Sequence, residues 1–156
     1  MSSEVEVRAL TPADLPALER MEVELFGPAA WSPESLAAEI VGPGRWYVGA
    51  TVGGELVGYA GLWFDGFDAQ VMTIGTDERF QGQGLGRLML ANLLDRAREV
   101  GAAVVLLEVR VDNLAALHLY ESVGFERLGK RRGYYQPGNI DAWTMRLDLR
   151  GQEEAG

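Results

Sequence analysis

A chain of 156 residues in which 47% are apolar and 24% are charged can bury the core of one globular domain, which we place at residues 1–150 with a frayed tail at 151–156. The formal net charge of −9 disfavours general nucleic-acid binding, which needs a basic surface, and suits either a cationic substrate or simple solubility. The absence of cysteine and the single histidine, His118, exclude disulfides, a cysteine nucleophile and a metal centre built from several histidines.

The first 40 residues predict one strand and two helices. Residues 5–9 have the pattern of a short strand, and Thr11-Pro12 marks the start of a helix. A threonine cap accepts a hydrogen bond from the first turn, and a proline in that turn lacks only an N–H that has no partner there. Gly27-Pro28 ends this helix, and a second helix at 32–40 starts with the same pair of signals. The apolar side of the first helix is predicted to consist of Leu15, Leu18, Met21, Val23 and Leu25.

The rest of the chain predicts hairpins first and strand–helix alternation afterwards. The expected elements are strands at 46–52, 56–64 and 70–76, a helix at 84–100, a strand at 104–111, a helix at 113–122 and strands at 125–130 and 142–149. The order β-α-α-β-β-β-α-β-α-β-β indicates an α/β (α+β) fold with a mixed, mostly antiparallel sheet flanked by helices. A doubly wound dinucleotide-binding fold would alternate strands and helices throughout, and the pattern disfavours it.

A glycine-rich turn, residues 81–87, lies between a predicted strand and a predicted helix. Glycines allow the backbone to approach a ligand closely, and the first N–H groups of a helix point toward an anion at its start. The helix dipole adds partial positive charge at the same end, and Arg79 and Arg87 can add formal charge. These properties predict a cradle for a pyrophosphate group.

The glycine spacing distinguishes between phosphate-binding motifs. The dinucleotide motif G-x-G-x-x-G fails because its last glycine is missing, whether it is counted from Gly82 or from Gly84, and the P-loop pair Gly-Lys-Ser/Thr is absent. Gln81, Gly84 and Gly86 fit the pattern Gln-x-x-Gly-x-Gly, which resembles the acetyl-CoA signature of the GNAT acetyltransferase family. A glycine-rich helix start without a ligand is the remaining alternative.

This resemblance implies both a fold and a set of cofactor contacts. The order of elements above matches the GNAT fold, in which the strand before the turn holds the pantetheine arm of acetyl-CoA by backbone pairing. The resemblance therefore implies that acetyl-CoA is the acetyl donor. The implied contacts are Ile74, Gly75, Thr76, Gln81, Gly82, Gln83, Gly84, Leu85, Gly86 and Arg87.

A second group of candidate residues surrounds Glu108. Side chains alternate along a strand, so Glu108 and Arg110 share one face, and a carboxylate in an apolar run is costly unless it is paired or used. An ion pair with Arg110, or a strand face exposed to solvent, is the structural alternative to a catalytic role. Asn113 and Tyr120 lie two helical turns apart on one face, a spacing also typical of core packing. His118 points to another side and is expected at the surface.

The same region resembles the bacterial ribosomal-protein-alanine N-acetyltransferase subgroup of the GNAT family. The resemblance rests on 107–113, 119–125, Trp31-Ser32, 131–135, Asp141-Ala142 and Met145, while Gly133 and the turn at 136–140 depart from the expected pattern. It implies that Glu108 is the general base, that Tyr120 is the general acid and that Asn113 contacts the cofactor. The implied reaction is direct acetyl transfer to the N-terminal alanine of a small-subunit ribosomal protein.

Two other functions stay open at this point: acetylation of a small-molecule amine or lysine side chain, and non-catalytic acyl-CoA binding. Trp31, Tyr134 and Tyr135 are candidates for a peptide groove or for ordinary packing. Glu22 and Glu24 are candidates to meet a basic peptide, but a solvated helix face is the expected position of both. The chain shows no signal-peptide pattern and no apolar run of about 20 residues. We therefore expect a cytoplasmic protein whose partners are acetyl-CoA and the N-terminal peptide of a ribosomal protein, without nucleic acid, membrane or metal.

Overall fold

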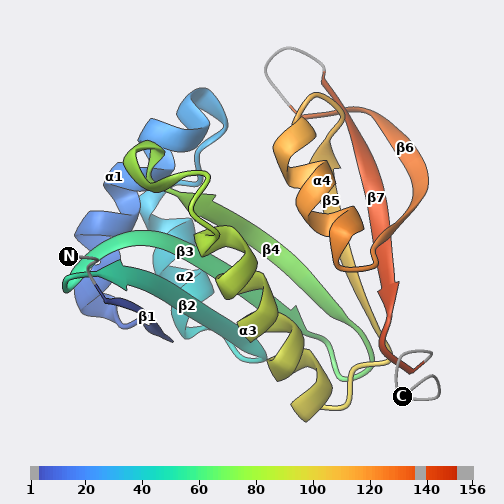
Figure 1. The fold of residues 1–156 in the computed structure, drawn as a ribbon, viewed down its shortest axis with the longest axis horizontal. Coiled ribbons are helices and arrows are strands. Elements are labelled where there is room, and N and C mark those ends of the chain that lie inside the picture. The colour runs from blue at the N-terminus through green and yellow to red at the C-terminus, as the bar shows by residue number, and fades with distance from the viewer. Residues whose placement is uncertain (1–3, 136–139, 151–156) are drawn as a thin grey trace.

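The computed structural model describes residues 4–135 and 140–150 of the chain. A seven-stranded sheet runs through the molecule and carries helices on both faces (Figure 1). The expected element order and the mixed, mostly antiparallel sheet are confirmed. The strands are β1 (Val5–Ala9), β2 (Arg45–Val52), β3 (Glu55–Phe64), β4 (Ala69–Thr76), β5 (Val104–Arg110), β6 (Glu126–Tyr135) and β7 (Ile140–Asp148). The α-helices are α1 (Leu15–Phe26), α2 (Pro33–Val41), α3 (Leu85–Glu99) and α4 (Leu114–Ser122).

Polar caps mark the start of α2 and of the turn that leads into α1. Ser32 Oγ accepts a hydrogen bond of 3.1 Å from the N–H of Ser35 at the start of α2. The start of α1 differs from the expectation, because Thr11 caps a short 3₁₀ turn, Pro12–Asp14, and the α-helix begins only at Leu15. A 3₁₀ turn of this kind is a common way to enter a helix.

Asp14 orders this helix start. Its carboxylate accepts a 2.9 Å hydrogen bond from the N–H of Thr11 and two hydrogen bonds, of 2.8 and 2.9 Å, from the Arg8 guanidinium on β1. The Arg8 guanidinium, and after it the Thr11 amide, lower the pKa of Asp14 below its ordinary value, while partial burial opposes them. The side chain therefore joins the first strand to the first helix through its charged form.

Replacing Asp14 with asparagine is expected to lower the free energy of unfolding by about 1 kcal/mol near neutral pH, since both the cap and the ion pair are weakened. Because the pKa of Asp14 is lower in the folded than in the unfolded state, its contribution is present above the unfolded carboxyl pKa of about 3.9 and is lost as the pH falls through the folded value. Urea unfolding of both proteins at about pH 7 and about pH 3 measures this difference. A difference that did not shrink in acid would show that the charge of Asp14 is not its source.

The sheet splits between two of its central strands. The strand order is β1-β2-β3-β4-β5-β7-β6, and all neighbouring pairs are antiparallel except β4 and β5. These two parallel strands pair only at Ala69↔Val105 and Gln70↔Leu106. Figure 1 shows them diverging beyond these pairs, with α3 on one side of the gap and α4 on the other. The carboxyl ends of β4 and β5 are therefore free to border a ligand.

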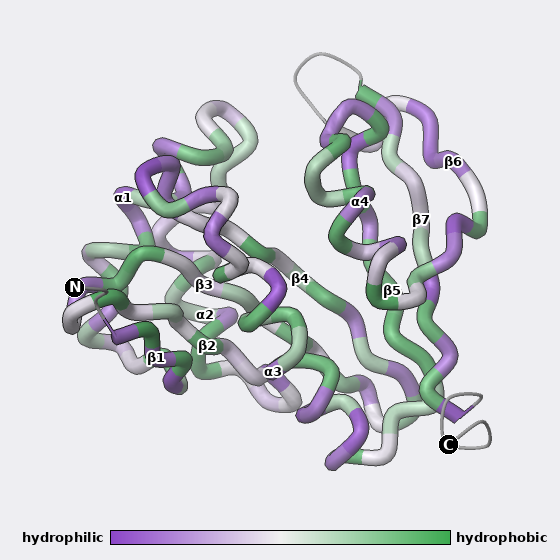
Figure 2. Tube along the Cα trace, viewed as in Figure 1, coloured by the Kyte–Doolittle hydropathy of each residue, from purple (hydrophilic) through white to green (hydrophobic). Residues whose placement is uncertain are grey.

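Two apolar clusters hold the helices to the sheet. The larger cluster joins the sheet to α3 and α4 and includes the fully buried Met89, Leu93 and Val105. The smaller cluster lies under α1 and includes Leu18 and Tyr59. Burying one large apolar side chain stabilises a fold by about 1.5–3 kcal/mol, so these clusters fix the frame of the split sheet. Figure 2 shows hydrophobic residues along β5, whereas much of β6 is hydrophilic.

Two details differ from the sequence expectations. Val23, predicted on the apolar side of the first helix, is 63% exposed, because it lies far around the helix from the buried Leu18 and Met21. The strand expected at 125–130 extends to Tyr135, because its pairing with β7 continues through Arg131↔Ala142 and Tyr135↔Ile140.

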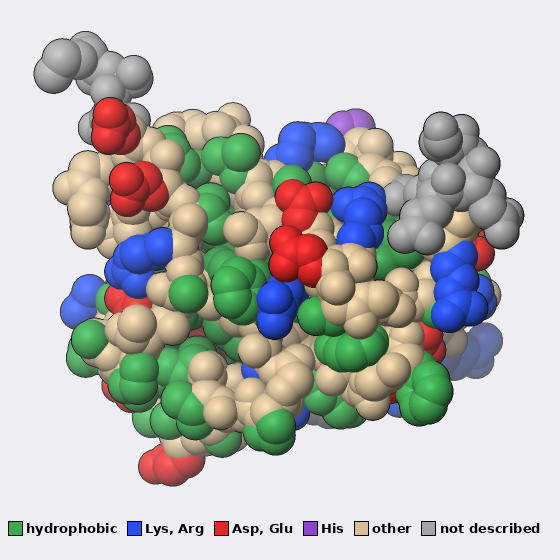
Figure 3. All heavy atoms as spheres, turned by 90° about the horizontal axis from the view of Figure 1, so that it is seen from below, with side chains coloured by type: hydrophobic (Ala, Val, Ile, Leu, Met, Phe, Trp, Pro, Cys, Tyr) green, Lys and Arg blue, Asp and Glu red, His purple; other side chains and the backbone are tan. Residues whose placement is uncertain are grey.

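Within the described ranges, no helix is both long and apolar enough to cross a membrane. The face seen in Figure 3 carries acidic and basic side chains interspersed with apolar ones rather than one continuous basic surface. On α3, for example, Arg96 pairs with Glu99 and Arg98 pairs with Asp95, each at 3.4 Å.

Candidate active site

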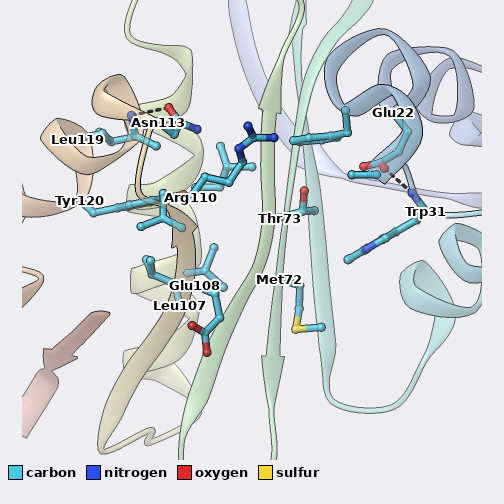
Figure 4. A pocket seen from close by; sticks show the side chains of 16 residues that line it. Glu22, Trp31, Met72, Thr73, Leu107, Glu108, Arg110, Asn113, Leu119 and Tyr120 are labelled. Atoms are coloured by element: carbon cyan, nitrogen blue, oxygen red, sulfur yellow. Dashed lines mark hydrogen bonds between the residues drawn. The ribbon is translucent and has the colours of Figure 1, made fainter. Parts of the chain in front are cut away.

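A cavity of about 230 Å³ lies in the gap between β4 and β5 (Figure 4). Its walls come from these two strands, from the end of α1 with the loop that follows, and from α4. Its polar and aromatic lining residues include Glu22, Trp31, Thr73, Glu108, Arg110, Asn113 and Tyr120. Glu108 and Tyr120, the two candidate catalytic residues, thus border the same cavity.

The backbone of β4 is irregular where it borders this cavity. Gly61 of β3 pairs with Thr73 while the next residue, Leu62, pairs with Val71, so Met72 is an extra residue on β4. A bulge of this kind bends its strand and interrupts the regular ladder. Because β5 pairs with β4 only as far as Gln70, the bulged segment faces the cavity without a neighbouring strand on that side.

The glycine-rich turn leads from the end of β4 into α3. Gly82 and Gly84 have φ angles of +79° and +84°, a left-handed backbone that glycine adopts without strain. The side-chain amide of Gln81 donates a 3.0 Å hydrogen bond to the carbonyl of Thr76. The turn is therefore shaped by its glycines and tied to β4 by its glutamine.

The start of α3 presents backbone donors. The first helical hydrogen bond joins the N–H of Leu88 to the carbonyl of Gly84 at 3.1 Å. The N–H groups of residues 85–87 consequently have no carbonyl acceptor within the helix. Together with the dipole of a 15-residue helix, they form a site suited to an anion.

A second cavity lies over this helix start. Four residues line both cavities, Ile74, Asn113, Ala116 and Leu119, so the two are neighbouring parts of one cleft. The second cavity is lined by Arg87 and His118 and, within the part of the chain that the structure describes, by no carboxylate. In a chain of net charge −9, such a lining favours an anionic ligand.

Most of the predicted cofactor contacts lie at this cleft. The second cavity is lined by Ile74, Thr76, Gln81, Gly82, Gly84, Leu85, Gly86, Arg87 and Asn113. Gly75 and Gln83 are not among the lining residues, and a Cβ at Gly75 would point at Leu25 and Tyr59 on the α1 side of the sheet. Arg79, expected beside the turn, instead forms ion pairs with Glu55 and Asp77 and borders a separate cavity beside α1.

Glu108 lies on the face of β5 that is turned away from the α3 and α4 core, as strand alternation predicts. Its Oε2 accepts a 2.8 Å hydrogen bond from the hydroxyl of Thr144, its cross-strand partner on β7. Its Oε1 accepts a 3.2 Å hydrogen bond from the Arg131 guanidinium on β6. Arg110, considered above as an ion-pair partner, binds Asp112 through two hydrogen bonds of 2.9 and 3.0 Å. The carboxylate of Glu108, 15% exposed, is therefore oriented by two neighbouring strands at the edge of the cavity.

Tyr120 and Asn113 come from α4 and its cap. Asn113 caps the helix, since its side-chain oxygen accepts a 3.1 Å hydrogen bond from the N–H of Ala116. Tyr120 is buried, and its ring meets that of Phe125 edge-on with centroids 5.8 Å apart. Core packing thus fixes a phenol ring that also borders the cavity. His118 is exposed, as expected, although it lines the second cavity.

The opposite wall of the first cavity includes Trp31 and Glu22 (Figure 4). The expectation that Glu22 lies on a solvated helix face is wrong, because this side chain is only 2% exposed. Tyr134, 41% exposed, stacks with the Arg131 guanidinium 4.5 Å from its ring centre. The side chain of Tyr135 and the turn residues 136–139 lie outside the described part of the chain.

Three features at or next to the cleft were missed or misplaced from the sequence. Glu22 had a readable signal, because it lies four residues after Leu18 and therefore on the buried side of α1. Thr144 had none, because its contact with Glu108 depends on the register between β5 and a strand 36 residues later. The bulge at Met72 depends on the register between β3 and β4 in the same way.

The cleft offers different chemical groups at its two ends. A helix start suited to an anion lies at one end, and the carboxylates of Glu22 and Glu108 and the phenol of Tyr120 border the other end. Within the described residues, no group of three or more histidine, aspartate or glutamate side chains is arranged to hold a metal ion.

Comparison with known proteins identifies similar chains. Residues 15–125 match the model of the acetyltransferase (GNAT) family. The chain is 49% identical over 149 residues to the N-alpha-acetyltransferase RimI of Mycobacterium tuberculosis, with 92% of each chain covered. It is 34% identical over 147 residues to the [ribosomal protein bS18]-alanine N-acetyltransferase of Escherichia coli, covering 92% of this chain and 97% of that one.

A solved structure shows the same likeness in three dimensions. The crystal structure of the ribosomal-protein-S18-alanine N-acetyltransferase from Escherichia coli superposes with a TM-score of 0.86. The two chains are 32% identical, and the match covers 94% of each.

Proposed function

Because this chain belongs to the GNAT acetyltransferase family, we propose that it transfers the acetyl group of acetyl-CoA directly to the N-terminal alanine of a small-subunit ribosomal protein. The chain is an acetyl-CoA-dependent N-acetyltransferase. The proposal concerns its acceptor, its catalytic residues and its contacts with the donor. In it, Glu108 is the general base and Tyr120 is the general acid.

The observation that carries this proposal is the continuity of the cleft. A diphosphate placed against the N–H groups of residues 85–87 would lie in the second cavity, beside Arg87. The residues shared by both cavities then lead to the gap between β4 and β5. In the proposal the pantetheine arm follows this path along residues 74–76, and Asn113 borders it from the other side.

The reaction needs three actions from the protein. Acetyl-CoA supplies a thioester. In the proposal, a backbone N–H of the bulged segment of β4 polarises the thioester carbonyl. Glu108, acting through a water molecule, accepts the proton that the attacking amine loses. Tyr120 gives a proton to the departing thiolate, so no covalent enzyme intermediate is needed. This fits a chain that contains no cysteine.

An N-terminal amine is the easier acceptor for such a site. Its pKa of about 7.7–8.0 leaves roughly a tenth of it neutral near pH 7, whereas a lysine amine with a pKa of about 10.4 is neutral only about once in several thousand. A base of modest strength is therefore sufficient for an N-terminus. The relatives named [ribosomal protein bS18]-alanine N-acetyltransferase support a ribosomal-protein alanine as the acceptor.

A peptide assay tests the proposed acceptor. The protein is incubated with acetyl-CoA and a peptide carrying the N-terminus of ribosomal protein S18, and CoA release is followed together with the peptide mass. We expect one acetyl group on the N-terminus and none on internal lysines. Faster turnover of a panel of small amines or of lysine peptides would instead assign the enzyme to another acceptor class.

Replacing Tyr120 with phenylalanine is expected to lower kcat about 10²-fold, because the ring is kept while the proton donor is lost. The thermal midpoint should change little, since the edge-on contact with Phe125 remains. Steady-state kinetics and thermal unfolding measure the two effects. An unchanged kcat would show that Tyr120 is not the general acid.

A further inference from the structure

A buried carboxylate that the proposed mechanism does not use lies across the cavity from Glu108. Glu22 of α1 is 2% exposed, yet it lines the first cavity. Burying a carboxylate is costly unless donors satisfy it. Its contacts are therefore informative about its role.

Both carboxylate oxygens of Glu22 accept hydrogen bonds from other parts of the fold. Oε1 accepts a 2.6 Å hydrogen bond from the hydroxyl of Tyr59 on β3. Oε2 accepts a 2.7 Å hydrogen bond from the backbone N–H of Trp31. Burial and the neighbouring carboxylate raise the pKa of Tyr59, so its hydroxyl stays a donor.

The bond to Trp31 ties down the connection between α1 and α2. This connection begins with a short 3₁₀ turn, Gly27–Ala29, and reaches the cap of α2 at Ser32. Other hydrogen bonds of this stretch stay local: the N–H of Ala30 bonds to Gly27, and the Ser32 hydroxyl accepts from Ser35. Among the hydrogen bonds of the described residues, that from Trp31 to Glu22 links the middle of the loop to the body of the domain, beside the packing of the Trp31 ring against the cluster under α1.

The tethered loop forms one wall of the cavity. Ala29 and Trp31 of the loop line it, together with Phe26 at the end of α1. Figure 4 shows the Trp31 side chain directed toward Met72 and Thr73 on β4, while Glu108 and Tyr120 approach from the opposite side. This wall and Glu108 border the same cavity, whereas the proposed donor path runs along the other end of the cleft.

We propose that Glu22 is a positioning residue that holds the Trp31 loop as the acceptor-side wall and thereby limits the size of the first acceptor residue. It acts through Trp31 and does not touch the reacting atoms. The inference rests on the proposed acceptor class. Because Glu22 works by hydrogen-bond geometry, glutamine can replace it: the amide oxygen accepts from Trp31 and the amide nitrogen donates to the hydroxyl of Tyr59.

The experiment compares Glu22→Ala, Glu22→Gln and, as a matched control, Glu24→Ala on the exposed side of the same helix. Kinetic constants are measured for acetyl-CoA and for peptides starting with alanine or leucine. Glu22→Ala is expected to raise the KM of the alanine peptide about tenfold. The ratio of kcat/KM for the alanine peptide to that for the leucine peptide should fall, and the KM of acetyl-CoA should stay unchanged. Glu22→Gln and Glu24→Ala should stay within about threefold of the wild type.

The other outcomes are equally decisive. If Glu22→Gln is as impaired as Glu22→Ala, the charge itself contacts the acceptor and the positioning role is overturned. If Glu22→Ala raises both KM values equally, or lowers only the thermal midpoint, Glu22 is merely structural. A wild-type protein that acetylates neither peptide refutes the proposed acceptor instead, which separates the two failures.

Discussion

Replacing Glu108 with glutamine is expected to lower kcat on the order of 10²- to 10⁴-fold, the usual scale for loss of a positioned general base. Glutamine keeps the size of the side chain and can still accept the hydrogen bond from Thr144, but it cannot take up the proton of the attacking amine. Acetyl-CoA affinity should stay within about threefold, because Glu108 borders only the acceptor end of the cleft. Turnover of the S18 peptide and calorimetric titration with acetyl-CoA measure the two quantities.

The matched control for this prediction is Glu126→Gln. Glu126 is an exposed glutamate at the start of β6 and lies outside both cavities, so its replacement should leave turnover unchanged. A Glu108→Gln protein with wild-type kcat would show that another group accepts the proton. Loss of acetyl-CoA binding in that variant would show that Glu108 binds the cofactor and is not the general base.

Replacing Gly84 with valine is expected to weaken acetyl-CoA binding on the order of 10²-fold, and kcat at saturating donor should change much less. Gly84 caps α3 with φ +84°, where a β-branched residue is strained. A Cβ at Gly84 meets no protein atom within 4 Å, and Gly84 lines the second cavity, so the new methyl groups would occupy space proposed for the diphosphate. Calorimetry with CoA measures the effect.

Gly54→Val separates strain from crowding. Gly54 lies in the turn between β2 and β3 with φ +86°, and a Cβ there also meets nothing within 4 Å. Both variants should therefore lose a similar amount of stability, about 1–2 kcal/mol from the left-handed backbone. Only Gly84→Val should lose donor affinity. Equal affinities for CoA in the two variants would mean that the diphosphate does not lie at the start of α3.

The parts of the fold and site that follow local rules could be predicted from the sequence. The cap at Ser32 and the glycines of the turn at 81–87 act on residues only a few positions away, so a linear pattern contains them. The alternation that places Glu108 off the core face of β5 is equally local. The family resemblance added a hypothesis that the residue pattern alone left open, namely a catalytic role for Glu108 as the alternative to a structural ion pair with Arg110.

The remainder depends on contacts between distant segments. No local pattern shows that β4 and β5 pair at only two positions, although this split creates the cavity. The donors to Glu108 come from β6 and β7, and their identity depends on strand register. The burial of Glu22 could have been predicted from its position four residues after Leu18, but its two partners, Tyr59 and Trp31, reach it only in the folded chain.

A crystal structure of the protein with bound CoA tests the central claim most directly. The account predicts that the diphosphate accepts hydrogen bonds from the N–H groups of residues 85–87 and that the thiol lies between β4 and β5, beside Glu108 and Tyr120. A diphosphate bound elsewhere, or a thiol directed away from the gap between these strands, would contradict it.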